Sequence, residues 1–168
     1  MSISMYQASV PVLARTLNNL INILEKGAAH AEAKKLDPSV LLNSRLFPDM
    51  FALARQVQIA CDMSKGAVAR LAGDEPVKFE DTETTFADLI ARVRKVISIV
   101  EGYKAAQIDG SETRDVVLKS PRGDMNFKGQ AYLQGFVLPN VYFHVTTTYN
   151  ILRHNGVEIG KMDFIGQP

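Results

Sequence analysis

The stretch NVYFHVTTTYNILRHNG, residues 140–156, places a histidine inside an apolar helical pattern. Asn140, His144 and Thr148 are spaced by four residues, so a helix carries all three on one face. Val141 and Ile151 flank that face. A polar row beside apolar neighbours indicates a helix that turns polar groups toward the interior of a bundle, where each group needs a hydrogen-bond partner.

Working outward, the pattern predicts one long helix over residues 130–154. Asn155-Gly156 is a stop signal. Pro139 lies inside the helix and deprives the backbone near Gly135 of a hydrogen bond, so we expect a bend there. The preceding residues 114–129 are strand-like, and Ser120-Pro121-Arg122-Gly123 suits a β-turn, so we expect a small β-hairpin directly before this helix.

Three further segments have the periodicity of amphipathic helices. The first has an apolar stripe from Tyr6 to Leu24 and is expected to end at Gly27, a residue favoured in a left-handed cap. The second is expected over residues 48–73 and the third over residues 86–103. Four such helices predict an all-α four-helix bundle with a hairpin between the third and fourth helices. Its core is expected to contain Leu13, Leu17, Leu20, Val57, Val68, Leu89, Val93, Val96, Val145 and Leu152.

Length and charge bound the class of protein. The 168 residues correspond to one domain, residues 1–168, and the formal net charge is only +1. Lys and Arg are scattered along the chain, which argues against a nucleic-acid surface. No apolar run reaches the length that spans a bilayer, and the first residues lack the pattern of a secretory signal. We therefore expect a soluble cytoplasmic protein with no membrane partner.

A second polar row lies on the helix over residues 48–73. Gln58 and Asp62 belong to it, and they are candidates to meet Asn140, His144 and Thr148 across the bundle. We expect His144 within hydrogen-bond or one-water reach of Asp62 or Gln58, at the edge of a small-molecule pocket. His144 would then be the base, Asp62 its charge partner and Asn140 a positioning group. The alternative is a solvated face on the earlier helix, with an ion pair between Asp62 and Lys65 and a His144 that serves packing alone.

The segment HVTTTYNILRHNG resembles the last helix of the DinB/YfiT-like four-helix bundles. In that superfamily an HxxxH motif is followed by Leu-Arg and then Gly, and His144 takes the place of the second histidine, with Leu152, Arg153 and Gly156 matching downstream. The helix ending ARLAG is also similar. With MFALARQVQIACD, KGAVARLAG and EDTETTF, the whole chain resembles a bacterial branch known only as a domain of unknown function.

The resemblance implies a divalent metal held by one side chain of the second helix and two of the fourth, in a superfamily that includes thiol-dependent transferases and isomerases. Here the first motif position is Asn140, and the second-helix position falls near Gln58 or Asp62. An amide is a poor ligand for zinc or nickel, so any metal would depend on His144 and Asp62. The resemblance also implies a homodimer.

Two functions remain open on this sequence. One is the binding or transformation of a small molecule in an interhelical pocket around His144, with a degenerate metal site. The other is a non-catalytic dimeric scaffold whose polar cluster only specifies packing. Whether the protein is an enzyme is left undecided.

Overall fold

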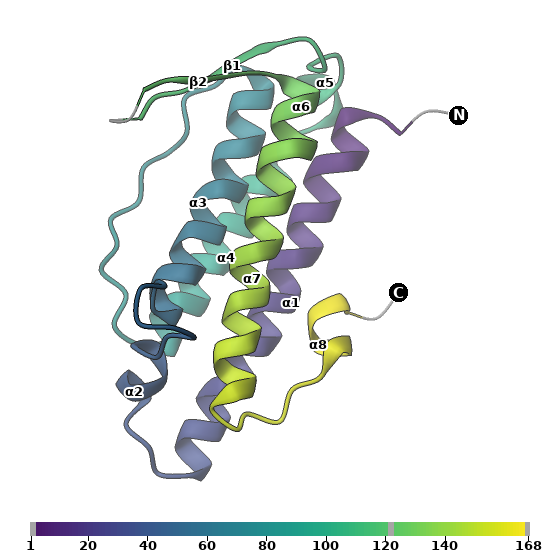
Figure 1. The fold of residues 1–168 in the computed structure, drawn as a ribbon. Helices are drawn as coiled ribbons and strands as arrows, with labels where there is room; N and C mark the ends of the chain where they lie inside the picture. The colour runs from purple at the N-terminus through teal and green to yellow at the C-terminus, as the bar shows by residue number, and fades with distance from the viewer. Residues whose placement is uncertain (1–2, 121–122, 167–168) are drawn as a thin grey trace.

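The computed structural model describes residues 3–120 and 123–166. Within them four long helices pack side by side: α1 (Met5–Ala33), α3 (Leu53–Ala72), α4 (Phe86–Gly102) and α7 (Leu138–His154) (Figure 1). α1 packs mainly against α4, and α3 packs against both α7 and α4. The predicted all-α four-helix bundle is confirmed.

The bundle contains one long return connection. α3 and α4 run in the same direction, so residues 74–85 travel back along the length of the bundle between them (Figure 1). We call residues 74–85 the strap. A bundle with two consecutive parallel helices requires such a crossover. As a result, a polar extended segment lies along α3 and α4 where a simple up-and-down bundle has solvent.

A hairpin closes the end of the bundle between α4 and α7, as predicted. After the short α5 (Ala105–Ile108), β1 (Asp115–Leu118) pairs antiparallel with β2 (Met125–Lys128), with Val116 opposite Phe127. Residues 121 and 122 of the expected turn lie outside the described residues, but the Gly123 N–H donates to the Ser120 carbonyl at 3.0 Å. α6 (Gly129–Tyr132) then leads into the last long helix.

Two helix boundaries differ from the sequence prediction. α1 does not end at Gly27 but continues to Ala33, because the alanine-rich residues 28–33 are good helix formers. Gly27 is instead a close-packing position, where an added Cβ would lie 3.1 Å from the Phe86 ring. The second long helix begins at Leu53, not near residue 48, because residues 47–50 form a turn closed by the Met50 N–H and the Phe47 carbonyl.

The irregularity expected around Pro139 takes the form of a π-helical turn, η1 (Leu133–Val137). The Leu138 N–H donates to the Leu133 carbonyl, five residues back. Pro139 has no N–H to donate, and it falls in the first turn of α7, where a proline is tolerated. The interruption of the regular α-helical hydrogen bonds thus lies in the turn before Pro139.

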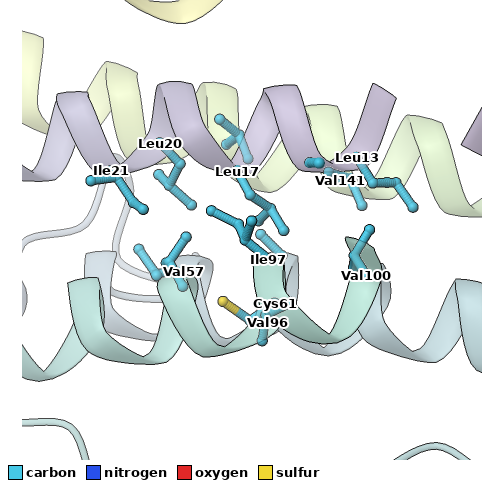
Figure 2. Packing of buried hydrophobic residues seen from close by; sticks show 14 of the residues in the cluster. Leu13, Leu17, Leu20, Ile21, Val57, Cys61, Val96, Ile97, Val100 and Val141 are labelled. Atoms are coloured by element: carbon cyan, nitrogen blue, oxygen red, sulfur yellow. The ribbon is translucent and has the colours of Figure 1, made fainter. Parts of the chain in front are cut away.

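All ten residues of the predicted core are fully buried, and Figure 2 shows part of this packing between α1, α3, α4 and α7. Leu41 of α2 (Pro38–Leu42) adds to one end of the core. The C-terminal residues dock against the body through Ile159 and Phe164, whereas Ile165 of α8 (Lys161–Ile165) is 41% exposed.

Candidate functional site

His144 lies between α7 and α3 and is 8% exposed. Its Nδ1 is 2.6 Å from Oε1 of Gln56, and the Gln56 amide nitrogen donates to the Phe51 carbonyl at 3.0 Å. That second bond turns the oxygen of Gln56 toward the imidazole, so Nδ1–H is the donor. In the neutral ring the lone pair then resides on Nε2.

The surroundings of His144 favour the neutral imidazole. Burial lowers the pKa of His144, and the positive charge of Arg55 lowers it further. The Phe143 ring meets the imidazole edge-on, with ring centroids 5.3 Å apart. At neutral pH His144 is therefore an uncharged hydrogen-bond donor to Gln56.

In the structure the residue in direct contact with His144 Nδ1 is Gln56, a partner that was not expected, whereas Asp62 and Gln58 are hydrogen-bonded or ion-paired elsewhere. On a helix with 3.6 residues per turn, Gln58 points about 160° and Asp62 about 120° away from Gln56. Gln56 therefore faces α7, while the other two side chains face the strap and α4. The residues that contact His144 and those of the expected row therefore lie on different sides of α3.

Asn140 and Thr148, the other members of the α7 row, bind their own helix. Asn140 Nδ2 donates to the Phe136 carbonyl at 2.7 Å, and Thr148 Oγ1 donates to the His144 carbonyl at 3.0 Å. Among the described residues, neither side chain forms a hydrogen bond with a ring nitrogen of His144. The row shares a face, as expected, but it does not converge on one ligand.

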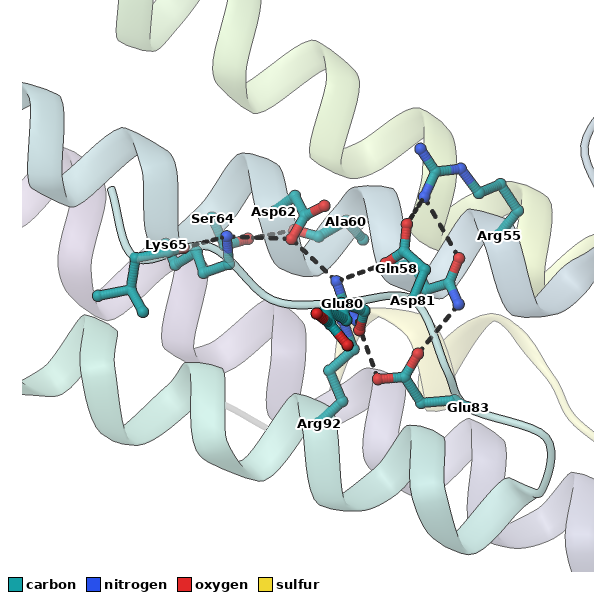
Figure 3. Close-up of polar contacts among 11 residues, drawn as sticks. Arg55, Gln58, Ala60, Asp62, Ser64, Lys65, Glu80, Asp81, Glu83 and Arg92 are labelled. Carbon is teal, nitrogen blue, oxygen red and sulfur yellow. Dashed lines mark hydrogen bonds and ion pairs between the residues drawn. The ribbon is translucent and has the colours of Figure 1, made fainter. Parts of the chain in front are cut away.

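A second polar cluster centres on Arg92 of α4, whose side chain is only 2% exposed (Figure 3). Its Nη2 pairs with Asp62 at 3.0 Å and with Asp81 at 2.9 Å. Its Nη1 pairs with Glu83 at 2.9 Å and donates to the Glu80 carbonyl at 3.0 Å. One guanidinium thus joins α3, α4 and the strap.

The α3 row completes this cluster. Gln58 Nε2 donates to Glu83 at 3.0 Å, and Arg55 pairs with Asp81 and donates to Gln58 Oε1 at 3.3 Å. Lys65 donates to the Val77 carbonyl at 2.7 Å. The predicted ion pair between Asp62 and Lys65 is present at 3.1 Å. The strap therefore covers part of the face expected to be solvated in the alternative interpretation: Gln58 and Lys65 are buried, whereas the Asp62 side chain is still 38% exposed.

The charges of the cluster are mutually stabilised. Burial of Glu83 opposes its ionisation, but hydrogen bonds from Arg92, its own backbone and Gln58 outweigh that effect and hold the pKa of Glu83 below its usual value. Arg92 is desolvated too, yet Glu83 and Asp62 keep its pKa raised. Behind it, burial raises the pKa of Cys61 to about 12, so that side chain is a thiol at neutral pH.

The donor set does not fit a zinc or nickel ion. His144 and Gln56 are in direct contact, which leaves no space for an ion between them, and Asp62 is committed to Arg92 and Lys65. Across residues 3–120 and 123–166, no group of three His, Cys, Asp or Glu side chains is arranged to hold a metal. The two residues expected to share a metal, His144 and Asp62, belong to different clusters.

Asp62 does line a hollow, but on the strap side. This hollow has a volume of about 360 Å³ and is lined also by Lys65, Arg70 and Phe79. Three cationic groups lie near the centroid of the Phe79 ring: Lys95 Nζ at 4.5 Å, Lys65 Nζ at 5.1 Å and the guanidinium carbon of Arg92 at 5.5 Å. The predicted site residues therefore fall into two environments rather than one pocket.

Sequence reasoning missed Gln56 and Arg92, and both had a signal. Gln56 lies three residues after Leu53 and four before Ala60, which places it on the buried side facing α7. Arg92 lies three residues after Leu89 and four before Val96, within the apolar stripe of α4. A charged residue in such a stripe requires buried partners, and the acidic strap nine to twelve residues earlier supplies them.

No helix in the described part of the chain is long and apolar enough to cross a membrane.

Comparison with known proteins places the chain in a family. The model of the domain of unknown function DUF1993 matches residues 5–165. The chain is similar to a DinB family member protein from Shewanella denitrificans, whose crystal structure is known. The two sequences are 44% identical, the alignment covers 97% of this chain and 92% of that chain, and the TM-score is 0.88. No functionally curated protein matches. The chain therefore belongs to the DUF1993 family and is a DinB-like helical bundle.

Proposed function

We propose that this protein is a non-catalytic, self-associating scaffold whose polar clusters specify how its helices pack. The observation that carries the proposal is the 2.6 Å contact between His144 and Gln56. In the superfamily, the corresponding place between the second and fourth helices is expected to hold a metal. Here a direct hydrogen bond occupies it, and such a bond fixes the register of two helices without any ligand.

The Arg92 cluster supports the same proposal. Asp62, Asp81 and Glu83 all pair with one buried guanidinium, and Gln58 adds an amide bond to Glu83. Each of the five candidate residues named from the sequence thus has a partner within the protein. Side chains that are already paired have to give up those bonds before they can bind a substrate.

The test is a thermal-shift screen with divalent metals, thiols and small metabolites, combined with elemental analysis of the purified protein. It compares the parent chain with His144→Ala and with a matched control, His154→Ala, which alters an exposed histidine at the end of α7. A scaffold shows no stoichiometric metal and no shift in Tm that depends on His144. A shift of several degrees that His144→Ala abolishes and His154→Ala retains contradicts the proposal.

A second candidate function is the binding of a small molecule at His144, and one observation favours it. Nδ1–H is held by Gln56, and none of the hydrogen bonds of the described residues uses Nε2. Gln56 therefore orients the imidazole as outer-shell partners orient a catalytic base or a metal-ligating histidine. In this case Gln56→Leu weakens the ligand-induced shift as His144→Ala does, while Gln58→Leu leaves it unchanged.

A further inference from the structure

The outward side of α7 carries no formal charge before Arg153 in its last turn. From Gly129 to Leu152 the chain has no Asp, Glu, Lys or Arg. Tyr142 and Phe143, in the middle of α7, are 40% and 55% exposed. Two adjacent half-exposed rings on an uncharged helix form an apolar surface of the kind that marks a contact site.

This surface continues on both sides of α7. The Phe143 ring touches His144, whose partner Gln56 is bonded to the Phe51 carbonyl, and the Phe51 side chain is 53% exposed. On the other side Tyr142 lines a hollow of about 310 Å³ together with Ile165 of α8 and with Arg15 of α1, which donates to the Ile165 carbonyl at 3.1 Å and is the charged residue at the rim of this surface. We define the α7 face as the surface formed by Phe51, Tyr142, Phe143, Ile165 and the exposed Thr146 of α7.

We propose that the α7 face is the contact between two copies of this chain, related by a two-fold axis that passes near Phe143. The inference rests on the scaffold function proposed above and names its partner surface. In a two-fold contact each residue near the axis meets its own copy, so a charged face brings like charges together. The α7 face avoids this, because its central residues are uncharged over the whole of α7 up to Arg153.

The size of the face also suits a second copy. α7 has 17 residues and is therefore about 25 Å long. With the loop before α3 on one side and α8 on the other, the face is roughly three helix widths across, at about 10 Å for each width. Its area is thus on the order of the 800 Å² that each partner buries in a stable protein–protein interface. A nucleic acid or a strongly charged partner would instead require clustered charges on this surface.

The experiment is sedimentation of the parent chain and of two surface variants. Phe143→Asp and Thr146→Arg each place a charge on the α7 face, next to the same charge of the second copy. Val117→Asp is the matched control, because Val117 is 47% exposed but belongs to β1 at the end of the bundle. We expect a dimeric parent, a dimeric control, and a dissociation constant at least tenfold higher for both α7 variants. Thr146→Arg changes an exposed polar residue, so it remains informative if Phe143→Asp folds poorly.

Two outcomes overturn the inference, and they separate it from the proposed function. If the parent is a dimer and both α7 variants remain dimers as tight as the control, then another surface joins the copies and the scaffold function stands. If the parent sediments as a monomer at micromolar concentration, both the inference and the self-association fail, whatever else the face then binds. The packing role of His144 is tested independently by the thermal-shift screen.

Discussion

α3 makes two polar contacts of opposite character. Toward α7 it offers the amide of Gln56 to a neutral His144. Toward the strap and α4 it offers Asp62 to the buried Arg92, inside a network of ion pairs. Both contacts lie between packed elements, yet only the second contains formal charges. The comparison shows that His144, the residue most typical of a catalytic or metal site, forms a single neutral hydrogen bond. The charged side chains instead hold the strap against the bundle.

The difference has an energetic meaning. A neutral pair that loses one partner leaves one buried polar atom unsatisfied. A buried charge that loses its partners also loses the interactions that compensate its desolvation, which is a larger penalty. The strap contact should therefore be the more sensitive of the two to mutation, and four measurements test this ordering.

Arg92→Met should have the largest effect. The substitution keeps much of the side-chain volume but leaves Glu83, which is 11% exposed, and the carboxylates of Asp62 and Asp81 without their shared cation. We expect a loss of about 3–5 kcal/mol in the free energy of unfolding, measured with urea. The matched control is Arg94→Met, whose side chain is 63% exposed and pairs with Glu25 at the surface. The control should lose less than about 1 kcal/mol. Equal losses in the two variants would show that the buried ion pairs of Arg92 contribute no more to stability than a surface pair.

His144→Leu and Gln56→Leu should each be less costly than Arg92→Met. Each leaves the other polar group buried without its partner, so we expect losses of about 1–3 kcal/mol. The double variant places two leucines in contact and should lose less than the sum of the single variants. A double-mutant cycle from urea unfolding gives this coupling energy. Strict additivity would show that the 2.6 Å contact does not contribute to stability.

The two contacts should also respond to acid at different pH values. The pKa of His144 is lowered in the folded protein by burial and by Arg55, so the unfolded chain binds the proton more tightly. Its contribution to stability is therefore present above about pH 6.5 and is lost as the pH falls toward the folded pKa. The pKa of Glu83 is also lowered, so its contribution is lost only below about pH 4.3.

The measurement is urea unfolding between pH 5 and pH 8. His144→Leu should flatten the decline in stability that the parent shows below neutrality, and each tenfold difference in proton affinity between the two states corresponds to about 1.4 kcal/mol. His154→Ala, at an exposed position, should keep the slope of the parent. A parent whose stability is constant over this range would show that His144 titrates alike in both states.

Asn140→Ala should have the smallest effect. Its side chain donates to the Phe136 carbonyl of the preceding turn, a bond that contributes about 0.5–1.5 kcal/mol. Alanine is the better helix former by about 0.6 kcal/mol, which offsets much of that loss. We expect a net change within about 1 kcal/mol by thermal unfolding. A loss of 3 kcal/mol or more would indicate that Asn140 also holds η1 in place.

The fold could be predicted because its signal is local and repeated. Leu13, Leu17 and Leu20 repeat an interval that only a helix satisfies, and the same holds for Leu89, Val93 and Val96. The end of α1 could not be predicted in the same way. Gly27 has the identity of a cap residue, but its small size serves the contact with Phe86 and Leu152, which are distant in the sequence.

The candidate site was predictable only in part. His144 was correctly placed on an inward face, because its row on α7 depends on spacing alone. Its partner depends on how α3 is rotated about its own axis, and a helix that is buried on several sides gives no single apolar face to fix that rotation. The sequence indicated a polar face of α3 that could be exposed to water. The strap instead buries Gln58 and Lys65 on that face.

The return connection also bears on how fast the chain folds. The two most extensive helix contacts, α1 with α4 and α3 with α7, each join helices that have another long helix between them in the sequence. Neither contact can form as a local helical hairpin, so a long loop has to close before the apolar stripes meet. Chains with such high contact order fold more slowly than those built from neighbouring hairpins. In stopped-flow refolding this bundle should therefore be slower than an up-and-down bundle of equal length and stability, because its crossover places partner helices far apart along the chain.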